Sequence, residues 1–412
     1  MEKYAGSEAV SGRFSKMSDW AEKNVKENIL PFWIDRVRDY ERGGFHGTVM
    51  CDGTPVKDSS RLLVLNARIL WSFSNAYRVF GTAVYKEMAD EAYRYLTTYF
   101  EDKENGGYYF SVDCDGKPLE TQKVVYTEAF VIYAFSEYHR ATGHEEAAKK
   151  AWEIFELLEK YSIDTKYRGY IEQLSADWKY DASNVETALN PEDSGGTKTM
   201  NTHLHLLEAY TCLLRINKDK KLVESMREMI DIMLSRIINT DINHFGMYFT
   251  DEWKSTVPTI SYGHDIEGTW LIMEACEVLG EEEVTQRAKK ICMDMARACL
   301  LEGLDEEGSM YSEVEPGETD ISSNRTWWVQ SEAVIGFLNA WQMTGEMDLL
   351  EASEATLAYI DRYFVDNEYG EWHTSVDRKE PVDYTKEKKI QGWKAPYHNS
   401  RMCIEIIERY RH

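Results

Sequence analysis

The sequence predicts an all-α protein, an (α/α)6 barrel in which six helical hairpins, or twelve main helices, close into a ring. Three observations lead to this fold class: a short glycine–aromatic pattern recurs six times, two helical patterns separate successive copies, and the first and last helices can pair. The whole chain, residues 1–412, is expected to form a single catalytic domain. The repeat overrides the two or three average domains that length alone would suggest.

The repeated pattern is an acidic or polar turn, a glycine and then an aromatic residue, as in the segment from Glu41 to Phe45. Successive glycines are separated by 63, 62, 77, 62 and 62 residues. A fixed period of this length indicates a repeated supersecondary unit. The six glycines are Gly44, Gly107, Gly169, Gly246, Gly308 and Gly370.

Between successive turns lie two stretches with apolar residues at helical spacing, separated in the second unit by Gly81. The first series carries most of the Lys and Glu residues and is expected to form the outer ring. It spans 14–30, 84–101, 145–161, 219–239, 282–301 and 347–365. The second series is richer in aromatic residues and is expected to form the inner ring. It spans 59–80, 122–143, 198–216, 264–280, 325–345 and 396–410.

The ends of the chain favour a closed ring over an open solenoid, which remains the alternative. An open solenoid needs polar capping repeats at both ends. Here an outer-type helix comes first and an inner-type helix comes last, so the two can pair. The longest interval contains an insertion over 175–197, which is either a binding loop or a plain surface excursion.

The charge and the absence of targeting signals restrict the class of protein. With 72 acidic and 47 basic residues the formal charge is −25, so we expect neither nucleic-acid nor membrane partners. The N-terminus has no apolar signal segment, and no stretch is apolar enough to span a bilayer. The seven cysteines lack CxxC pairs and are expected to be reduced. We therefore predict a cytoplasmic enzyme that is a monomer or weak homodimer.

Polar residues that can carry chemistry gather at the starts of the inner-type helices. Asn201 and His205 share a helix face, and His264 and Glu267 lie one turn apart on the next inner-type helix. His398 stands at the start of the last helix. Histidine suits proton transfer near neutral pH, and a carboxylate one turn away can orient it, as Glu267 could do for His264.

Tryptophans beside these polar groups suit a carbohydrate, whose C–H faces pack on indole rings. Trp327, Trp328 and Trp393 could form such platforms. Other tryptophans are embedded in regular apolar stripes and are expected to pack in the core. These are Trp71, Trp152 and Trp341.

The motifs do not favour a metal or another cofactor. His203 and His205 resemble a ligand pair, but residues two apart on a helix point about 200° apart. The sequence contains no HExxH, no DxDxDG loop, no cysteine cluster and no phosphate-binding glycine loop. We predict that the protein needs neither a metal ion nor a nucleotide.

The residues at the inner-helix starts resemble those of the N-acylglucosamine 2-epimerase superfamily, most closely its cellobiose 2-epimerase branch, over nearly the whole chain. The segment after Trp393, with Tyr-His-Asn-Ser-Arg-Met-Cys, favours that branch over the GlcNAc-epimerising one. The residues before Arg68, Asn66-Ala67, depart from the pattern of this family, but Arg68 itself is in place. The segments that carry the resemblance are 67–74, 198–205, 261–267, 327–332 and 393–403.

The resemblance implies interconversion of reducing-end glucose and mannose in β-1,4-linked disaccharides, through removal of the C2 proton and a cis-enediol. It implies that His264 and His398 are the acid/base pair, and that His205 and Arg68 steady the oxygen at C1. The remaining implied residues are Glu267 and Glu332, which support the histidines, and Asn201, Tyr126, Trp393 and one of Trp327 or Trp328, which contact the sugar.

Several other functions fit the same sequence. An aldose–ketose isomerase or an N-acylglucosamine 2-epimerase would use the same barrel and the same enediol chemistry. An inverting glycoside hydrolase would need two carboxyl groups about 6.5–9.5 Å apart flanking the scissile bond. A lectin-like binder would explain the tryptophans but would leave the histidines without a task.

Overall fold

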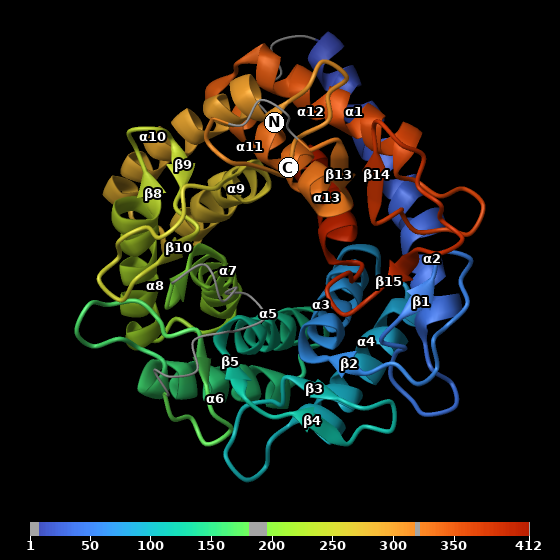
Figure 1. Cartoon of the computed structure of the whole chain (residues 1–412), viewed down its shortest axis with the longest axis vertical. Helices are drawn as coiled ribbons and strands as arrows, with labels where there is room; N and C mark the ends of the chain where they lie inside the picture. Colours follow the sequence, from blue (N-terminus) through green and yellow to red (C-terminus); the bar gives the residue numbers. More distant parts are fainter. Residues whose placement is uncertain (1–7, 181–195, 318–321, 412) are drawn as a thin grey trace.

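The computed structural model describes residues 8–180, 196–317 and 322–411, and it shows a ring of helices around a central axis (Figure 1). The inner ring is made of α3 (Leu63–Phe80), α5 (Val125–Thr142), α7 (Met200–Ile216), α9 (Tyr262–Leu279), α11 (Trp327–Thr344) and α13 (Tyr397–Arg411). The outer ring is made of α1 (Glu8–Asn24) with α2 (Leu30–Phe32), α4 (Ala83–Tyr95), α6 (Glu145–Tyr161), α8 (Lys220–Ile232), α10 (Glu282–Ala298) and α12 (Met347–Tyr363).

The described helices confirm the predicted closed (α/α)6 barrel. Each inner helix contacts the next, from α3 through α5, α7, α9 and α11 to α13, and α13 contacts α3 again. The outer helix α1 packs on α13, as the pairing of the first and last helices predicts. An open solenoid, the alternative left by the sequence, is therefore wrong. Inner helices touch neighbours on several sides, which explains their lack of a polar face.

The helix boundaries agree with the prediction except at some starts. The first helix is longer than 14–30, because α1 and α2 join through π-helical turns into one helix over residues 8–37. Four inner helices end as predicted in left-handed glycines, at Gly81, Gly143, Gly280 and Gly345.

Short antiparallel strands, which the sequence did not predict, precede most inner helices and delay their starts. Most of the pairings link neighbouring units at the same end of the ring. The pairs are β1 (Val49–Met50) with β15 (Lys388–Ile390), β5 (Lys123–Val124) with β6 (Gln173–Leu174), β7 (Lys198–Thr199) with β10 (Tyr248–Phe249), and β11 (Ile260–Ser261) with β12 (Glu313–Val314). The others are β13 (Asn324–Thr326) with β14 (Ser375–Asp377), β8 (Ile238–Asn239) with β9 (His244–Phe245), and the sheet β2 (Arg61–Leu62), β3 (Ser111–Val112) and β4 (Pro118–Glu120).

The six predicted glycine turns lie at this end of the ring, and five of their glycines have positive φ. The exception is Gly246, where Asn243 takes the left-handed conformation instead, with φ 58°. Gly246 is still needed for space, because a Cβ there would lie 2.6 Å from the ring of Phe249. The repeat therefore marks six turns of which the fourth has a different geometry.

A buried ion pair braces five of these six turns. In the second unit Asp102 accepts hydrogen bonds from the turn backbone and pairs with Lys123, which lies two residues before α5. The fourth unit has Asn239 and Ile260 at the corresponding positions, so both charges are missing there together, while Asn239 still accepts a backbone N–H. The five pairs, at 2.5–3.3 Å, are Asp39–Arg61, Asp102–Lys123, Asp164–Lys198, Asp305–Arg325 and Asp366–Lys389.

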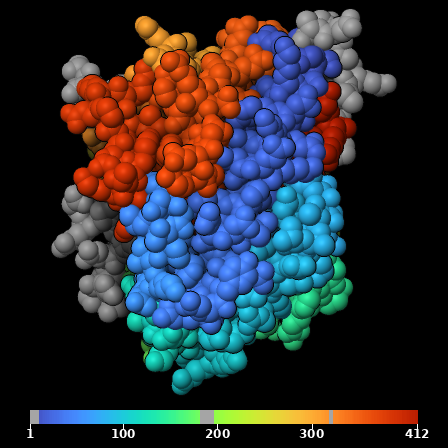
Figure 2. Space-filling model, turned by 90° about the vertical axis from the view of Figure 1, so that its right-hand side faces the viewer, coloured from blue at the N-terminus to red at the C-terminus, as the bar shows by residue number. Residues whose placement is uncertain are grey.

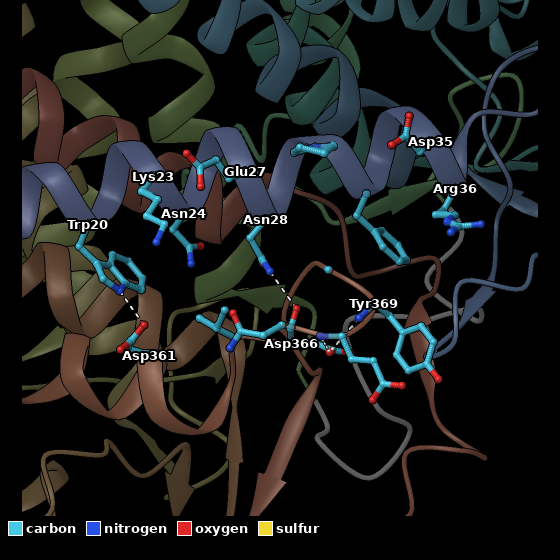
Figure 3. Close-up of a pocket in the computed structure, with 16 residues that line it drawn as sticks. Trp20, Lys23, Asn24, Glu27, Asn28, Asp35, Arg36, Asp361, Asp366 and Tyr369 are labelled. Atoms are coloured by element: carbon cyan, nitrogen blue, oxygen red, sulfur yellow. Dashed lines mark hydrogen bonds between the residues drawn. The ribbon is translucent and has the colours of Figure 1, made fainter.

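The ring closes along a seam where the first helix lies against α12 and the loop after it (Figure 2). Trp20 Nε1 donates to Asp361 at 2.8 Å, and Asn28 Nδ2 donates to the carbonyl of Asp366 at 2.9 Å, as Figure 3 shows. Deeper in the seam, Trp33 Nε1 donates to Glu371 at 2.6 Å. These bonds join residues about 340 positions apart in the chain, so they hold the barrel shut.

Three further predictions from the sequence concern parts of this fold. Most of the insertion over 175–197 falls on residues 181–195, which lie outside the described residues. All seven cysteines are free thiols and six of them are buried, as predicted. In the described ranges, every helix is too short or too polar to cross a membrane.

Candidate active site

A cavity of about 210 Å³ opens where the inner helices begin. Every one of the six inner units contributes to it, from α3 with Arg68 to the turn before α13 with Trp393. Ten of the eleven predicted site residues line this cavity, and the eleventh, Glu332, stands directly behind His398. The lining residues are Arg68, Tyr126, Asn201, His205, His264, Glu267, Trp327, Trp328, Trp393 and His398.

His398, the first of the two predicted acid/base residues, is held by a carboxylate. Its Nδ1 lies 2.7 Å from Oε1 of Glu332, and both residues are buried. Glu332 also accepts a hydrogen bond from Trp270 Nε1 at 3.0 Å. The ionised carboxylate of Glu332 can only accept hydrogen bonds, so Nδ1 of His398 carries the hydrogen. In the neutral imidazole Nε2 then keeps its lone pair and is available to a substrate.

His264 has a different partner from the one predicted. Its Nδ1 lies 2.8 Å from the hydroxyl of Ser261, whereas Glu267 turns away to Arg401. The expectation that Glu267 orients His264 is therefore wrong. Side chains on a helix lean toward its N-terminus, so His264 reaches back to Ser261, and the guanidinium of Arg401 attracts the carboxyl of Glu267.

Below the histidines, one guanidinium joins three buried carboxyl groups. Arg401 Nη2 lies 2.7 Å from both Glu267 and Glu332, and its Nη1 donates to Glu208. The hydroxyl of Tyr397 also contacts Glu208. Arg401 was not among the predicted site residues, although its position three residues after His398 puts it on the same helix face.

Glu208, Glu267 and Glu332 form an acidic layer around Arg401, and their carboxyl groups differ in how readily they ionise. Burial alone would raise the pKa of Glu332, but Arg401 and His398 outweigh it and hold that pKa at about 2. Burial and the neighbouring Glu332 raise the pKa of Glu267 well above its ordinary value. Burial also lowers the pKa of His264 and of His398 to about 3, so both imidazoles are neutral. Ionisation is therefore favoured at Glu332 and opposed at Glu267.

On the other side of the cavity, Arg68 and His205 lie close to Tyr126. Arg68 donates to the hydroxyl of Tyr126 at 2.6 Å and to the carbonyl of Trp393 at 3.0 Å. The ring of Tyr126 meets that of His205 edge-on, with centroids 5.1 Å apart. His205 Nδ1 bonds Glu208 at 2.9 Å, so Arg401 connects the supports of His205 and His398.

The two acid/base candidates do not face each other across the ring diameter. His264 belongs to α9 and His398 to α13, and α11 lies between these helices. Trp328 of α11 fills the interval, with its ring centroid 4.7 Å from His264 and 5.7 Å from His398. A small molecule resting against Trp328 is thus reached by both imidazoles from different directions.

The remaining predicted tryptophans and histidines take separate places. Trp393 stands beside Tyr126 with ring centroids 6.1 Å apart, and Trp327 is more deeply buried than Trp328. His203 points away from the cavity, because its Nε2 accepts the backbone N–H of Tyr170 at 3.0 Å. The predicted divergence of His203 and His205 is confirmed. Trp71 and Trp341 are buried in the core, and Trp152 packs against it.

The acidic layer superficially resembles a metal site. Ligand atoms of Glu267, Glu332 and His398 lie within 4.8 Å of one another. Arg401, however, places its guanidinium against both carboxyl groups and already supplies the positive charge. This arrangement fits the guanidinium of Arg401 better than it fits a metal ion.

Three larger hollows in the described structure lack histidines, and one of them, of about 500 Å³, is lined by Asp305 and Arg378. A groove of about 440 Å³ runs along the seam between the first helix and the loop after α12 (Figure 3). The third hollow, of about 330 Å³, lies at the opposite end of the barrel, where charged residues such as Arg78 and Glu137 pair with one another. Size alone therefore does not identify the site, and the chemistry points to the smaller cavity.

Comparisons with known proteins show what the chain is similar to. The profile of the N-acylglucosamine 2-epimerase (GlcNAc 2-epimerase) family matches residues 43–400. The cellobiose 2-epimerase of Bacteroides fragilis is 39% identical over 94% of this chain and 97% of its own, and that of Ruminococcus albus is 36% identical with the same coverage. The solved cellobiose 2-epimerase of Bacillus thermoamylovorans superposes with a TM-score of 0.90 at 35% identity, covering 96% of this chain and 100% of that one.

Proposed function

The chain belongs to the N-acylglucosamine 2-epimerase family, within which it groups with the cellobiose 2-epimerases, and we propose from this premise how its cavity inverts C2 of a sugar. It is an enzyme of the isomerase class, a carbohydrate epimerase. The substrate we propose is a β-1,4-linked disaccharide such as cellobiose or lactose, with glucose and mannose interconverted at its reducing end. The observation that carries the proposal is the pair of neutral imidazoles, His264 and His398, on either side of Trp328.

The reaction moves a proton from one face of C2 to the other. A proton next to an aldehyde is only weakly acidic, so the base must be positioned and the developing negative charge stabilised. In the opened sugar, one imidazole takes the C2 proton through Nε2 and leaves a cis-enediolate. The other imidazole, once it has taken up a proton at Nε2 from the solvent, returns that proton to the opposite face, and the first imidazole releases the C2 proton to the solvent. Because each base reaches one face, the reaction needs both His264 and His398.

Arg68 and His205 are placed to steady the oxygen at C1 while it carries negative charge. Arg68 is always cationic, and its bonds to Tyr126 and to the carbonyl of Trp393 fix its orientation before the substrate arrives. His205 is buried and its Nδ1 bonds Glu208, which stabilises the imidazolium form, and in that form its Nε2 can donate to the C1 oxygen. Such preorganised donors stabilise the transition state without reorganisation during the reaction.

The supporting roles follow from the contacts. Glu332 orients His398 and stabilises its imidazolium, while Glu267 completes the layer around Arg401 instead of supporting His264. We expect the sugar to stack on Trp328 and Trp393, which are only partly buried, and expect Trp327 to back the site. Asn201 and Tyr126 line the cavity and would contact sugar hydroxyls.

Three further features belong to the same proposal. The reaction as derived uses only side chains, so we propose that it proceeds without a metal ion or nucleotide. A surface with a formal charge of −25 suits a small neutral sugar and not a nucleic acid. We also propose a cytoplasmic protein that is a monomer or weak homodimer.

Incubation with cellobiose and with lactose in D2O, followed by NMR, tests the function. We expect a mannose-ended product that carries deuterium at C2. A ketose product would instead indicate an aldose–ketose isomerase, which shares the enediol but delivers the proton to C1. Release of monosaccharides would indicate a glycoside hydrolase, and binding without any C2 exchange would indicate a sugar-binding protein.

A further inference from the structure

Ser261 is the residue before α9, a position at which a hydroxyl commonly caps the helix by accepting a backbone N–H. It does not do so here, since its side chain makes no capping bond. Ser261 is only 1% exposed, and its hydroxyl lies 2.8 Å from Nδ1 of His264. At the corresponding position before α7, Thr199 does cap its helix, by accepting from Thr202. The hydroxyl of Ser261 is therefore directed to the histidine.

A carboxylate lies on the far side of this hydroxyl. Ser261 faces Glu313 across the antiparallel pair of β11 and β12, and its Oγ donates to Oε1 of Glu313 at 3.5 Å. Glu313 is an exposed residue whose carboxyl group turns back toward Ser261. One step further along the same strands, Thr259 donates to Glu315. The two carboxylates have equivalent hydroxyl partners, but only that of Glu313 leads to a histidine.

The order of donors fixes the tautomer of His264. Ser261 Oγ donates to Glu313 at 3.5 Å, so its single hydroxyl hydrogen points to the carboxyl group of Glu313. The lone pairs of Ser261 Oγ then accept Nδ1–H of His264, and Nε2 keeps its lone pair for the C2 proton. His398 reaches the same state by a direct bond from Nδ1 to Glu332.

We propose that Ser261 and Glu313 are the positioning residues of His264, and that they do through a hydroxyl what Glu332 does directly for His398. The proposal rests on the proposed epimerisation. It assigns the two bases unlike supports: a buried carboxylate in contact with Arg401 for His398, and a neutral hydroxyl in contact with the exposed Glu313 for His264.

Variants that isolate each base provide the test. His398→Asn leaves only His264 to exchange C2 hydrogen, and His264→Asn leaves only His398. Exchange is measured by NMR in D2O for the glucose-ended and mannose-ended disaccharides. Ser261→Ala in the His398→Asn protein should slow exchange about tenfold, because one orienting hydrogen bond is lost. In the His264→Asn protein the same change should alter exchange less than twofold.

Conservative and neighbouring variants serve as controls. Ser261→Thr keeps the hydroxyl and should restore exchange to within about twofold of Ser261. Glu313→Gln should slow only the His264-dependent exchange, because an amide can also donate and so reverse the order of the bonds. Glu315→Gln removes a carboxylate two residues after Glu313, and Thr199→Ala removes the equivalent hydroxyl before α7. Neither variant should slow exchange.

The outcomes separate this inference from the proposed function. Equal losses in both histidine backgrounds would show that Ser261 is only structural, and an unchanged rate in the His398→Asn protein would exclude positioning altogether. Equal effects of Glu313→Gln and Glu315→Gln would remove Glu313 from the relay. If the parent protein neither epimerises nor exchanges C2 hydrogen, the proposed function itself fails.

Discussion

Replacing Glu332 with glutamine tests how much the acidic layer contributes to proton transfer. The substitution keeps the size of the side chain but removes a charge that Arg401 and His398 hold ionised, with a pKa of about 2. One oxygen of Glu332 lies 2.7 Å from both His398 Nδ1 and Arg401 Nη2. An amide at this place would put N–H donors against donors already present.

The size of the effect follows from the bond to His398. A hydrogen bond to a charged group contributes about 1.5–3 kcal/mol. It is strongest once His398 becomes an imidazolium, so most of it acts in the transition state. Since 1.36 kcal/mol is a factor of ten in rate, Glu332→Gln should lower kcat about 10-fold to 150-fold, with a smaller change in KM. Initial rates of epimerisation measure this, with circular dichroism as the check on folding.

Glu267→Gln is the matched control in the same layer. Because burial and Glu332 raise the pKa of Glu267, its carboxyl group ionises less readily than that of Glu332, and an amide there should remove less charge. We expect less than about a fivefold loss of kcat, given one altered neutral hydrogen bond. Equal losses in the two variants, or a Glu332→Gln enzyme as fast as its parent, would refute the charge assignment.

Four further predictions concern the same cavity. His264→Asn and His398→Asn should each abolish nearly all net epimerisation, yet each should still exchange C2 deuterium with one of the two epimeric substrates; a variant that epimerises near the parent rate would contradict the two-base assignment. The rate of C2 hydrogen exchange by the His398→Asn protein, measured from pH 5 to 8, should not fall by half near pH 6.5. The sign is fixed because burial lowers the pKa of His264 to about 3, so the neutral base persists throughout this range; an inflection near 6.5 would show an ordinary, solvated histidine. Trp393→Ala should weaken sugar binding by about 1–3 kcal/mol through loss of an apolar platform, seen chiefly in KM, and an unchanged KM would place Trp393 in the core. Activity should survive exhaustive dialysis against EDTA, and its restoration by one specific divalent ion would contradict metal independence.

The ring of helices was predictable because its signals are local and repeated. The spacing of the six turn glycines set the number of units, and helical periodicity between them set the elements. The location of the cavity followed from one inference, that polar residues at the starts of inner helices share one end of the ring. His205, His264 and His398 lie there for that reason.

Contacts between distant helices could not be predicted in the same way. Periodicity favoured Glu267 as the partner of His264, since the two are one turn apart, but it carries no information about Arg401 on another helix. Ser261 acts from a two-residue strand whose partner, Glu313, lies 52 positions away. Such short strands form through pairing across units, not through their own propensity, so single-sequence patterns do not reveal them.

The fourth turn, with Asn239 and Ile260 in place of an acid and a base, has a consequence for engineering this barrel. Removing one partner of a buried ion pair leaves an uncompensated charge and costs about 3–5 kcal/mol, whereas replacing both partners is often close to neutral. The fourth unit thus shows how such a turn is built without charges. The amide of Asn239 still accepts the backbone hydrogen bond, and the apolar side chain of Ile260 replaces the cation. Anyone who redesigns or transplants a unit of this toroid should treat Asp102 and Lys123, or their equivalents, as a single exchangeable part.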